Sequence, residues 1–314
     1  MTTTGNNMAS KKNFAVKAFL LTAVFILLPV FAQCSQLVKN AAVLLPAGSK
    51  VKFNWIIPPA EVKDKGAGII FKMDGSGNIW LGRDGKYVLN PNKNYMFGID
   101  RQYDDFVLTE KGSLYFAAKG YLGYIPPVKN NGTDTGIHPF QPIAKLPVNE
   151  CRLYSGAGNV IYVSGKNPDN GRYEVFTAAG ENVTRDKNDG MKMVYKKLFS
   201  AGNKISAAAG DGKTTFIAMD KLVVSSVTGL DKAEGFFKHS KETITGLAYD
   251  INAGIFYCTA KGVGYAGKNG STEFLAVSNP SIALSGGKLY VYIPAETAVV
   301  QVENISDFKG YALK

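Results

Sequence analysis

The stretch IIFKMDGSGNIWLGRDGKYVL, residues 69–89, shows the pattern that decides the fold. It contains an apolar strand, a tight turn with Gly77, a second strand rich in aromatic and β-branched residues, another turn, and a third strand. Apolar runs separated by short glycine-containing turns are typical of β-hairpins. The stretch therefore predicts a three-stranded β unit.

Five later segments repeat this order of strands and turns: residues 106–125, 152–177, 205–227, 244–267 and 282–303. A glycine precedes the second strand in every segment. These glycines are Gly77, Gly112, Gly158, Gly212, Gly254 and Gly287. Internal similarity of this kind predicts a fold built from repeated units.

The second strands are apolar on both faces, as Ile79 beside Trp80 and Ile255 beside Phe256 illustrate. A strand buried on both faces lies between packed sheets, as in a propeller blade between its two neighbours. A fourth run suited to an outer strand follows five of the six repeats. These runs are residues 94–100, 140–146, 193–199, 234–240 and 271–277.

The sixth repeat lacks a fourth run, and KVKFNWII (50–57) precedes the first repeat. We therefore expect an all-β, six-bladed β-propeller whose ring is closed by strand 50–57 in the last blade, which removes an open sheet edge. Five or seven blades remain alternatives because the fourth repeat, 204–240, has the weakest pattern. The sequence contains no helical period long enough to cross a sheet, which excludes α/β architectures.

The first 32 residues have the layout of a secretory signal peptide. Lys11, Lys12 and Lys17 precede an uncharged run from Ala18 to Ala32, which is shorter than the roughly 20 residues of a membrane span. We expect cleavage after Ala32 and a secreted, periplasmic or cell-surface protein without a stable membrane span. An uncleaved anchor and a lipoprotein modified at Cys34 are the alternatives. The expected domains are an N-terminal extension (33–49), the propeller (50–308) and a C-terminal tail (309–314).

The 314-residue chain has a formal charge of +11, and its basic residues are scattered singly. A basic surface attracts polyanions without selecting among them, and the absence of an arginine-rich tract argues against nucleic acid as a partner. Neither the two histidines nor the three cysteines have zinc-site spacing. We expect no metal and no cofactor, and we expect Cys151 and Cys258 to be buried and unpaired.

Two stretches resemble known families. DGSGNIWLGRDG (74–85) resembles the repeat of two-component-regulator-type propellers and their NHL-like relatives. GSLYFAAKGYLGYIPP (112–127) resembles the repeat of tachylectin-2-like lectins. The resemblance implies a β-propeller, and the lectin family implies carbohydrate as a ligand.

Acidic residues occur in four of the first-to-second-strand turns: Asp74, Glu110, Asp211 and Asp250. A metal-dependent propeller enzyme of the gluconolactonase-like kind needs carboxylates and asparagine around its central channel. Asp beside Gly is also favoured in turns for backbone reasons, and we interpret these residues as turn residues. We expect His138 and His239 to be surface residues, since nothing near them in sequence suggests a catalytic triad.

The candidate ligand-binding residues lie between the first two repeats. Loop 101–105 combines an aromatic ring with hydrogen-bonding groups, a composition suited to sugars or peptides, and His138 follows in the polar insertion 128–140. The predicted site comprises Arg101, Gln102, Tyr103, Asp104, Asp105 and His138. We expect this insertion and a second one, 178–192, to project from a face of the ring.

The sequence thus predicts an exported propeller that binds rather than catalyses. Lectin-like recognition of a surface or extracellular carbohydrate is the first hypothesis. The alternatives are an adaptor or scaffold for an extracytoplasmic protein and a metal-dependent lactonase or hydrolase. The sequence does not indicate the oligomeric state.

Overall fold

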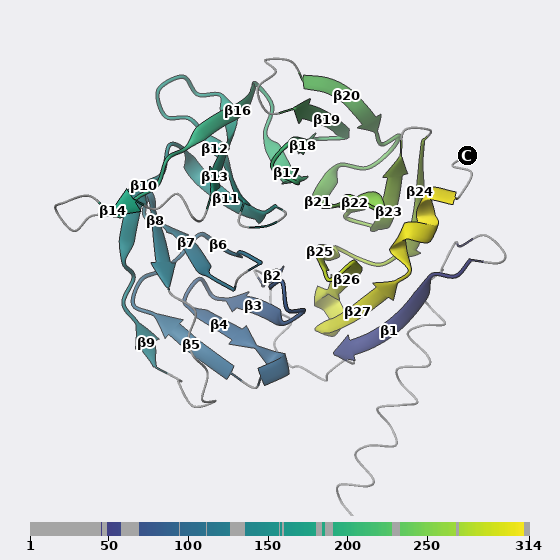
Figure 1. Ribbon diagram of the computed structural model, residues 1–314, viewed down its shortest axis with the longest axis horizontal. Coiled ribbons are helices and arrows are strands. Elements are labelled where there is room, and N and C mark those ends of the chain that lie inside the picture. The colour runs from purple at the N-terminus through teal and green to yellow at the C-terminus, as the bar shows by residue number, and fades with distance from the viewer. Residues whose placement is uncertain are drawn as a thin grey trace, which may run out of the picture.

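The computed structural model describes residues 45, 49–57, 69–93, 95–110, 112–125, 136–156, 158, 160–179, 184–185, 191–227, 233–267 and 270–310. Strands dominate this part of the chain, and no helix in it is long and apolar enough to cross a membrane. Six sheets of four or five strands surround a common centre (Figure 1). The six-bladed β-propeller expected from the repeats is confirmed.

The blades follow the chain order of the repeats, and the first strand of each repeat is innermost (Figure 1). Blade 1 contains β2 (Ile70–Met73), β3 (Ile79–Arg83), β4 (Tyr87–Asn90) and β5 (Tyr95–Ile99), and blade 2 contains β6 (Asp105–Leu108), β7 (Leu114–Ala118), β8 (Tyr121–Ile125) and β10 (Pro142–Lys145). Blade 3 contains β11 (Asn149–Ser155), β12 (Val160–Lys166), β13 (Tyr173–Ala179) and β16 (Lys196–Ala201), and blade 4 contains β17 (Ile205–Gly210), β18 (Thr214–Met219), β19 (Leu222–Val227) and β20 (Ala233–Lys238). Blade 5 contains β21 (Ile244–Asp250), β22 (Gly254–Thr259), β23 (Gly262–Gly267) and β24 (Gly270–Ala276), and blade 6 contains β25 (Ser281–Ser285), β26 (Lys288–Ile293) and β27 (Ala298–Glu303). The described residues also form three short 3₁₀ helices: η1 (Pro91–Lys93), η2 (Pro294–Glu296) and η3 (Ile305–Gly310).

The ring is closed by β1 (Lys52–Ile57), which pairs antiparallel with β27 as the outer strand of blade 6. Phe53 lies opposite Val302 and Trp55 opposite Val300. The junction continues beyond the strands, since the amide of Lys50 donates to Asp307 Oδ2 (3.1 Å) and Asn304 Nδ2 donates to the Lys50 carbonyl (2.7 Å). The predicted closure by segment 50–57 is confirmed.

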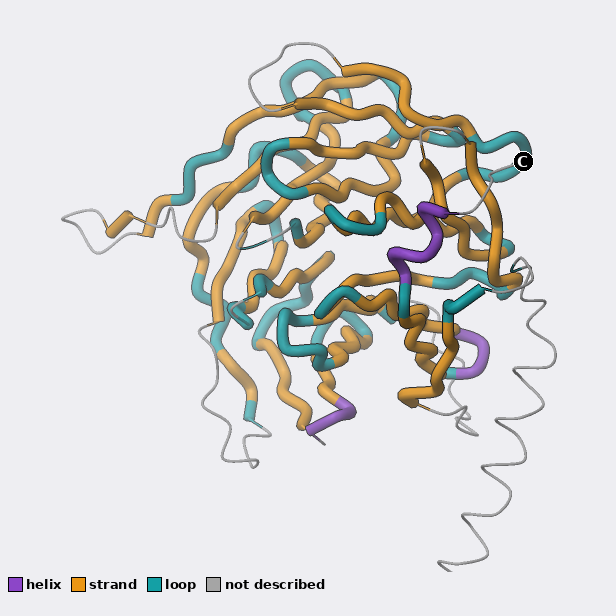
Figure 2. The backbone as a smooth tube through the Cα atoms, turned by 45° about the vertical axis from the view of Figure 1, so that its right-hand side comes forward, coloured by secondary structure: helices purple, strands orange, loops and turns teal. Residues whose placement is uncertain are grey.

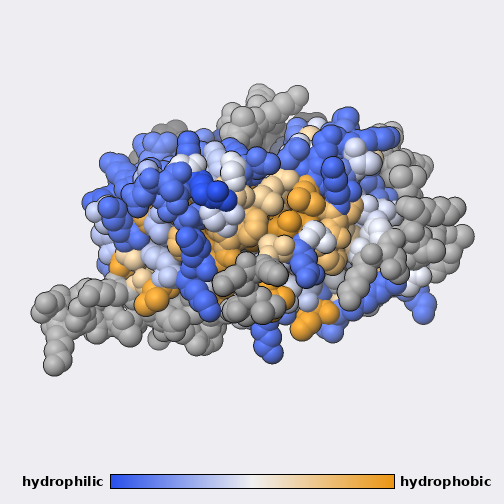
Figure 3. Space-filling view, turned by 90° about the horizontal axis from the view of Figure 1, so that it is seen from above, coloured by the Kyte–Doolittle hydropathy of each residue, from blue (hydrophilic) through white to orange (hydrophobic). Residues whose placement is uncertain are grey.

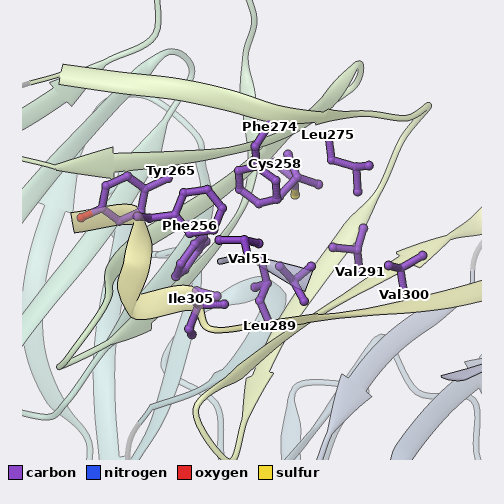
Figure 4. Packing of buried hydrophobic residues seen from close by; sticks show 14 of the residues in the cluster. Val51, Phe256, Cys258, Tyr265, Phe274, Leu275, Leu289, Val291, Val300 and Ile305 are labelled. Carbon is purple, nitrogen blue, oxygen red and sulfur yellow. The ribbon is translucent and has the colours of Figure 1, made fainter. Parts of the chain in front are cut away.

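Apolar side chains fill the space between neighbouring blades, because the strand faces are apolar on both sides. Between blades 5 and 6, Phe256, Phe274 and Leu289 pack together with Val51, the residue before β1 (Figure 4). Phe308 of η3 belongs to the same cluster; it is fully buried, with its ring centroid 4.6 Å from that of Phe274. Burial of one such side chain contributes about 1.5–3 kcal/mol.

The glycines before the second strands have positive φ angles. They range from 67° at Gly287 to 119° at Gly254, a backbone region that other residues enter only with strain. This requirement explains why the glycines recur at one position of each repeat.

The opposite face of the ring carries the second-to-third-strand turns and the links between blades. Backbone hydrogen bonds join the two in several blades: Leu146 N to Gly120 O (2.8 Å), Tyr103 N to Gly85 O (2.7 Å), His239 N to Lys221 O (2.7 Å) and Asn279 N to Ala260 O (2.8 Å). Backbone hydrogen bonds therefore hold the connections between blades against the neighbouring second-to-third-strand turns.

Parts of the two polar insertions are described. Two residues of the first form β9 (Ile137–His138), which pairs in parallel with β5 and extends blade 1. This end of the insertion lies along the ring, contrary to our expectation of a projecting loop. In the second, β14 (Thr184–Arg185) and β15 (Met191–Lys192) form a separate two-stranded ribbon away from the ring (Figure 2). The predicted signal peptide, residues 1–32, and Cys34 lie outside the described residues.

The histidine prediction was wrong for His239, which is 7% exposed. Its Nδ1 accepts the backbone amide of Glu242 (2.8 Å), and its Nε2 faces Glu273 Oε1 at 3.2 Å. The imidazole thus stabilises the connection between blades 4 and 5 by accepting a hydrogen bond from within it and contacting Glu273 of blade 5. Cys151 and Cys258 are buried and unpaired, as expected, and burial raises the pKa of the Cys258 thiol to about 11.

Candidate functional site

The loop proposed from the sequence as a binding site links β5 to β6 and is partly built into the core. Tyr103 is 3% exposed; its ring packs edge-on against Phe106 and Phe116, and its hydroxyl donates to the Tyr87 carbonyl (2.6 Å). Burial raises the pKa of Tyr103 above its usual value. Gly82 allows this packing, since a Cβ there would lie 2.8 Å from the Tyr103 hydroxyl. The ring is therefore not available as a stacking surface for a ligand.

Three of the predicted residues, Arg101, Gln102 and Asp104, are exposed. The guanidinium of Arg101 lies 5.7 Å from the ring centroid of Phe140, a cation–π contact. The backbone carbonyl of Asp104 accepts from Arg152 Nη1 at 3.4 Å. Arg152 was not identified from the sequence. It lies on the inner strand of another repeat, and no motif or spacing in the sequence indicates that it contacts this loop.

His138 lies beside the loop. Its carbonyl accepts the amide of Asp100, and the carboxylate of Asp100 accepts the amide of Phe140 (2.8 Å). The imidazole is half-buried and stands edge-on to Phe97, with centroids 5.1 Å apart. The structure therefore brings His138 and residues 100–104 together, and their role in ligand binding stays a prediction.

Asp105 points into the wall of the central ring. Its Oδ2 accepts the amide of Leu153 (2.8 Å) and its Oδ1 lies 3.5 Å from Lys72 Nζ. Lys72 Nζ also donates to the Leu153 carbonyl (2.6 Å). Because these residues lie on β2, β6 and β11, the contacts join the innermost strands of blades 1, 2 and 3. We call this set the Lys72–Asp105 bridge.

The aspartates of the first-to-second-strand turns accept backbone amides. Asp250 Oδ1 accepts those of Asn252 and Ala253 at 2.8 Å each, and Asp211 Oδ1 accepts those of Lys213 and Thr214. Such bonds are typical of turn-forming aspartates. In the described part of the chain, no group of three His, Cys, Asp or Glu side chains is placed to hold a metal ion.

The large apolar side chains on the surface of blade 1 were not identified from the sequence. Tyr87 is 42% exposed, Met96 44% and Ile137 71%. Tyr87 and Ile137 pair with Gly98 from either side, and Met96 lies two residues from Gly98 on β5. The three side chains therefore share one face of the sheet. We call them the blade 1 patch.

No family model and no curated protein matches the chain. Among solved structures, a gluconolactonase from Xanthomonas campestris is similar, with 9% sequence identity, a TM-score of 0.52, and coverage of 82% of this chain and 98% of that one. A luciferin-regenerating enzyme is similar with 11% identity, a TM-score of 0.50, and coverage of 74% and 88%. These likenesses show the fold. At such identities the activities of the two enzymes do not transfer to this chain.

The extracellular domain of a putative hybrid two-component system from B. thetaiotaomicron is a third similar structure, with 11% identity and a TM-score of 0.47. The match covers 79% of this chain and 40% of that one.

Proposed function

We propose that this chain is an exported propeller that acts as an adaptor by binding another extracytoplasmic protein. Export rests on the layout of residues 1–32, and binding rests on the blade 1 patch. The ring supplies a rigid frame, because the links between its blades are fastened by backbone hydrogen bonds.

The observation that carries the proposal is the exposure of Tyr87, Met96 and Ile137 on one face of blade 1. Gly98 lies between two of them, and a Cβ there would lie 3.4 Å from Ile137 Cγ1 and 3.5 Å from Tyr87 Cε1. The tyrosine and isoleucine therefore form a continuous surface across β4, β5 and β9. Contiguous exposed apolar side chains are a feature of protein interaction sites.

The two other hypotheses from the sequence have less support. Lectin-like binding relied on the ring of Tyr103, which is buried. A lactonase of the gluconolactonase-like kind needs free carboxylates at the channel, whereas the carboxylate of Asp105 is engaged by Lys72 and the Leu153 amide. Protein binding is therefore the function that the geometry supports best.

The test is site-specific crosslinking in cells that make the protein. A photoreactive side chain at Ile137 should give one crosslinked partner, and Ile137→Asp should reduce its co-purification with the tagged chain at least tenfold. The matched control is Ile251→Asp, since Ile251 is 67% exposed on a turn of blade 5. The two variants should melt at similar temperatures.

Three outcomes would contradict the proposal. Saturable, salt-resistant binding of a defined sugar on a glycan array, lost with Arg101→Ala, would support the lectin hypothesis. Turnover of a sugar lactone that depends on an added divalent metal would support the lactonase hypothesis. Equal co-purification of the partner with Ile137→Asp and Ile251→Asp would exclude the blade 1 patch as the binding surface.

A further inference from the structure

Among the described residues, none covers the seam between blades 3 and 4 at the side of the ring. The outer strands of these blades, β16 and β20, contain no buried residue, whereas four of the five residues of β5 are buried. These outer strands lie at the top of the ring in Figure 1, and Figure 3 shows an apolar area on that side surrounded by hydrophilic residues. The seam is therefore less completely covered than the edge of blade 1.

Strand register explains why the seam stays open. On β20, Gly235 pairs with Val224, which faces blade 3, and a Cβ at Gly235 would meet no atom within 4 Å. The large side chains of β20, Phe236 and Phe237, pack on the other side, toward blade 5. The outer strand of blade 4 thus has no bulky side chain at Gly235 to cover the seam.

Apolar side chains line the opening from both blades. Blade 3 contributes residues of β13 and β16, and blade 4 contributes residues of β19. Those half-buried against the core between the two blades are Tyr173, Leu198, Phe199 and Leu222. Together with Gly235 and Val224, these residues are the blade 3–4 seam.

Lysines flank the seam on the same strand faces. Lys166 pairs with Tyr173, Lys196 with Thr177, and Lys238 with Leu222, so their side chains point to the seam side of each sheet. All three lysines are exposed. The field at the edges of the seam is therefore positive.

The acidic residues of these strands face away from the seam. Glu174 is buried on the blade 2 side, where Lys197 Nζ lies 3.5 Å from its carboxylate. Glu234 pairs with Ser225, whose side chain lies on the blade 5 side. Neither carboxylate is therefore placed to neutralise the three lysines.

We propose that the blade 3–4 seam binds an extended segment of a partner protein in which bulky apolar side chains alternate with Asp or Glu. Successive side chains of an extended strand point to opposite sides, so the apolar ones contact the seam while the acidic ones reach the lysines. β16 and β20 are edge strands, whose outward backbone groups accept an added strand. Blade 1 shows such an addition within this chain, where β9 pairs with β5.

The seam is distinct from the blade 1 patch and lies across the ring from it (Figure 1). The proposal goes beyond the adaptor function, because it adds a second surface with a different preference. The blade 1 patch is apolar, whereas the seam combines apolar contact with positive charge. An adaptor with both surfaces holds two segments on opposite sides of one rigid ring.

Fluorescence anisotropy with the full chain tests the proposal. The probe is a labelled decapeptide that alternates glutamate with leucine and valine. We expect saturable binding that weakens as salt is raised from about 0.05 M to about 0.5 M, because salt screens exposed charges. The same peptide with lysine in place of glutamate should bind at least tenfold more weakly.

Two variants and their matched controls locate the binding site. Gly235→Phe fills the seam, and Lys196→Glu with Lys238→Glu reverses its charge; each should weaken peptide binding at least tenfold. Gly310→Phe is a substitution at another open glycine, and Lys52→Glu with Lys145→Glu reverses charges on the outer strands of blades 6 and 2. These controls should bind as the unchanged chain does, and thermal melts should show that all variants fold.

The outcomes separate this proposal from the adaptor function. Absence of saturable binding, or equal binding by Gly235→Phe and Gly310→Phe, would overturn the seam proposal. Binding to vesicles of anionic phospholipid that Gly235→Phe abolishes, without peptide binding, would identify a lipid surface as the partner instead. Ile137→Asp should leave peptide binding unchanged. The seam proposal can therefore hold even if the crosslinking experiment shows that the blade 1 patch binds no partner.

Discussion

Asp74 accepts four hydrogen bonds at the first turn of blade 1, and it is 7% exposed. The donors are the amides of Ser76 and Asn78, the Asn78 side chain, and Trp80 Nε1 at 3.0 Å. Removing a buried acceptor leaves its donors without partners. We predict that Asp74→Ala lowers the free energy of unfolding by about 3 kcal/mol, measured by denaturant titration.

Asp250→Ala is the matched control for this prediction. Its carboxylate accepts only two backbone amides in a turn that is more exposed, and its loss should cost about 1 kcal/mol. Equal losses from the two variants would show that the two side-chain donors to Asp74, Asn78 Nδ2 and Trp80 Nε1, contribute nothing to stability.

Glu174 supplies a pH-dependent contribution to stability. Burial by itself raises its pKa, but hydrogen bonds from Asn167 and Asn170 and the charge of Lys197 together lower the pKa below the usual glutamate value. A lowered pKa in the folded state stabilises the fold above the unfolded-state value of about 4.3, and this stability is lost as pH falls through the folded-state pKa. We predict that Glu174→Gln flattens the fall of melting temperature below about pH 4.3. If the melting temperature of Glu174→Gln fell with pH as steeply as that of the unchanged chain, the prediction would be wrong.

The sequence predicted the residues whose role is local. Asp74 and Gly77 were recognised as turn residues because Asp beside Gly has a backbone preference that no distant contact needs to supply. Tyr103 was predicted to bind a ligand, and His239 was expected at the surface because nothing near it in sequence suggested a catalytic triad. Both are buried against rings on other strands, such as Phe116 and Tyr257, and sequence spacing does not specify these contacts.

At the scale of the elements, the Lys72–Asp105 bridge ties β2, β6 and β11 together. Removing one member of a buried pair leaves a charge without compensation. We predict that Asp105→Ala lowers the free energy of unfolding by about 3 kcal/mol, again by denaturant titration. Glu303→Gln, which breaks the exposed Lys288–Glu303 pair, should change it little. A small effect of Asp105→Ala would mean that Lys72 and the Leu153 amide find other partners.

Most outer strands of the blades were predicted from the sequence, but one was not. The five outer strands after repeats 1 to 5 and the closing strand β1 were predicted because each is an apolar run at a fixed place in the repeat. β9 was not predicted, since two residues within a polar insertion have no periodicity and their parallel partner is set by the ring. The blade 1 patch depends on that pairing, because it brings Ile137 beside Gly98. The candidate binding surfaces were therefore the part of the protein that the sequence predicted least.

For the whole molecule, ring closure by β1 should decide whether the propeller is a monomer. Without β1, the edge of β27 is unpaired, and an open edge pairs with other chains. We predict that a chain beginning at residue 58 associates and loses its single sharp melting transition. Light scattering during size-exclusion chromatography and thermal unfolding measure these two properties.

The closing strand should also act when it is supplied separately. Its pairing with β27 and its apolar contacts with blade 5, through Phe53 and Trp55, do not require a covalent link to β2. A synthetic peptide of residues 50–57 added to the shortened chain should therefore restore a monomer and its sharp transition. The same peptide with Phe53→Asp should fail, because its charge would be placed against Phe274. A shortened chain that stays monomeric and melts as the full chain does would show that five complete blades and an open sixth suffice to hold the ring.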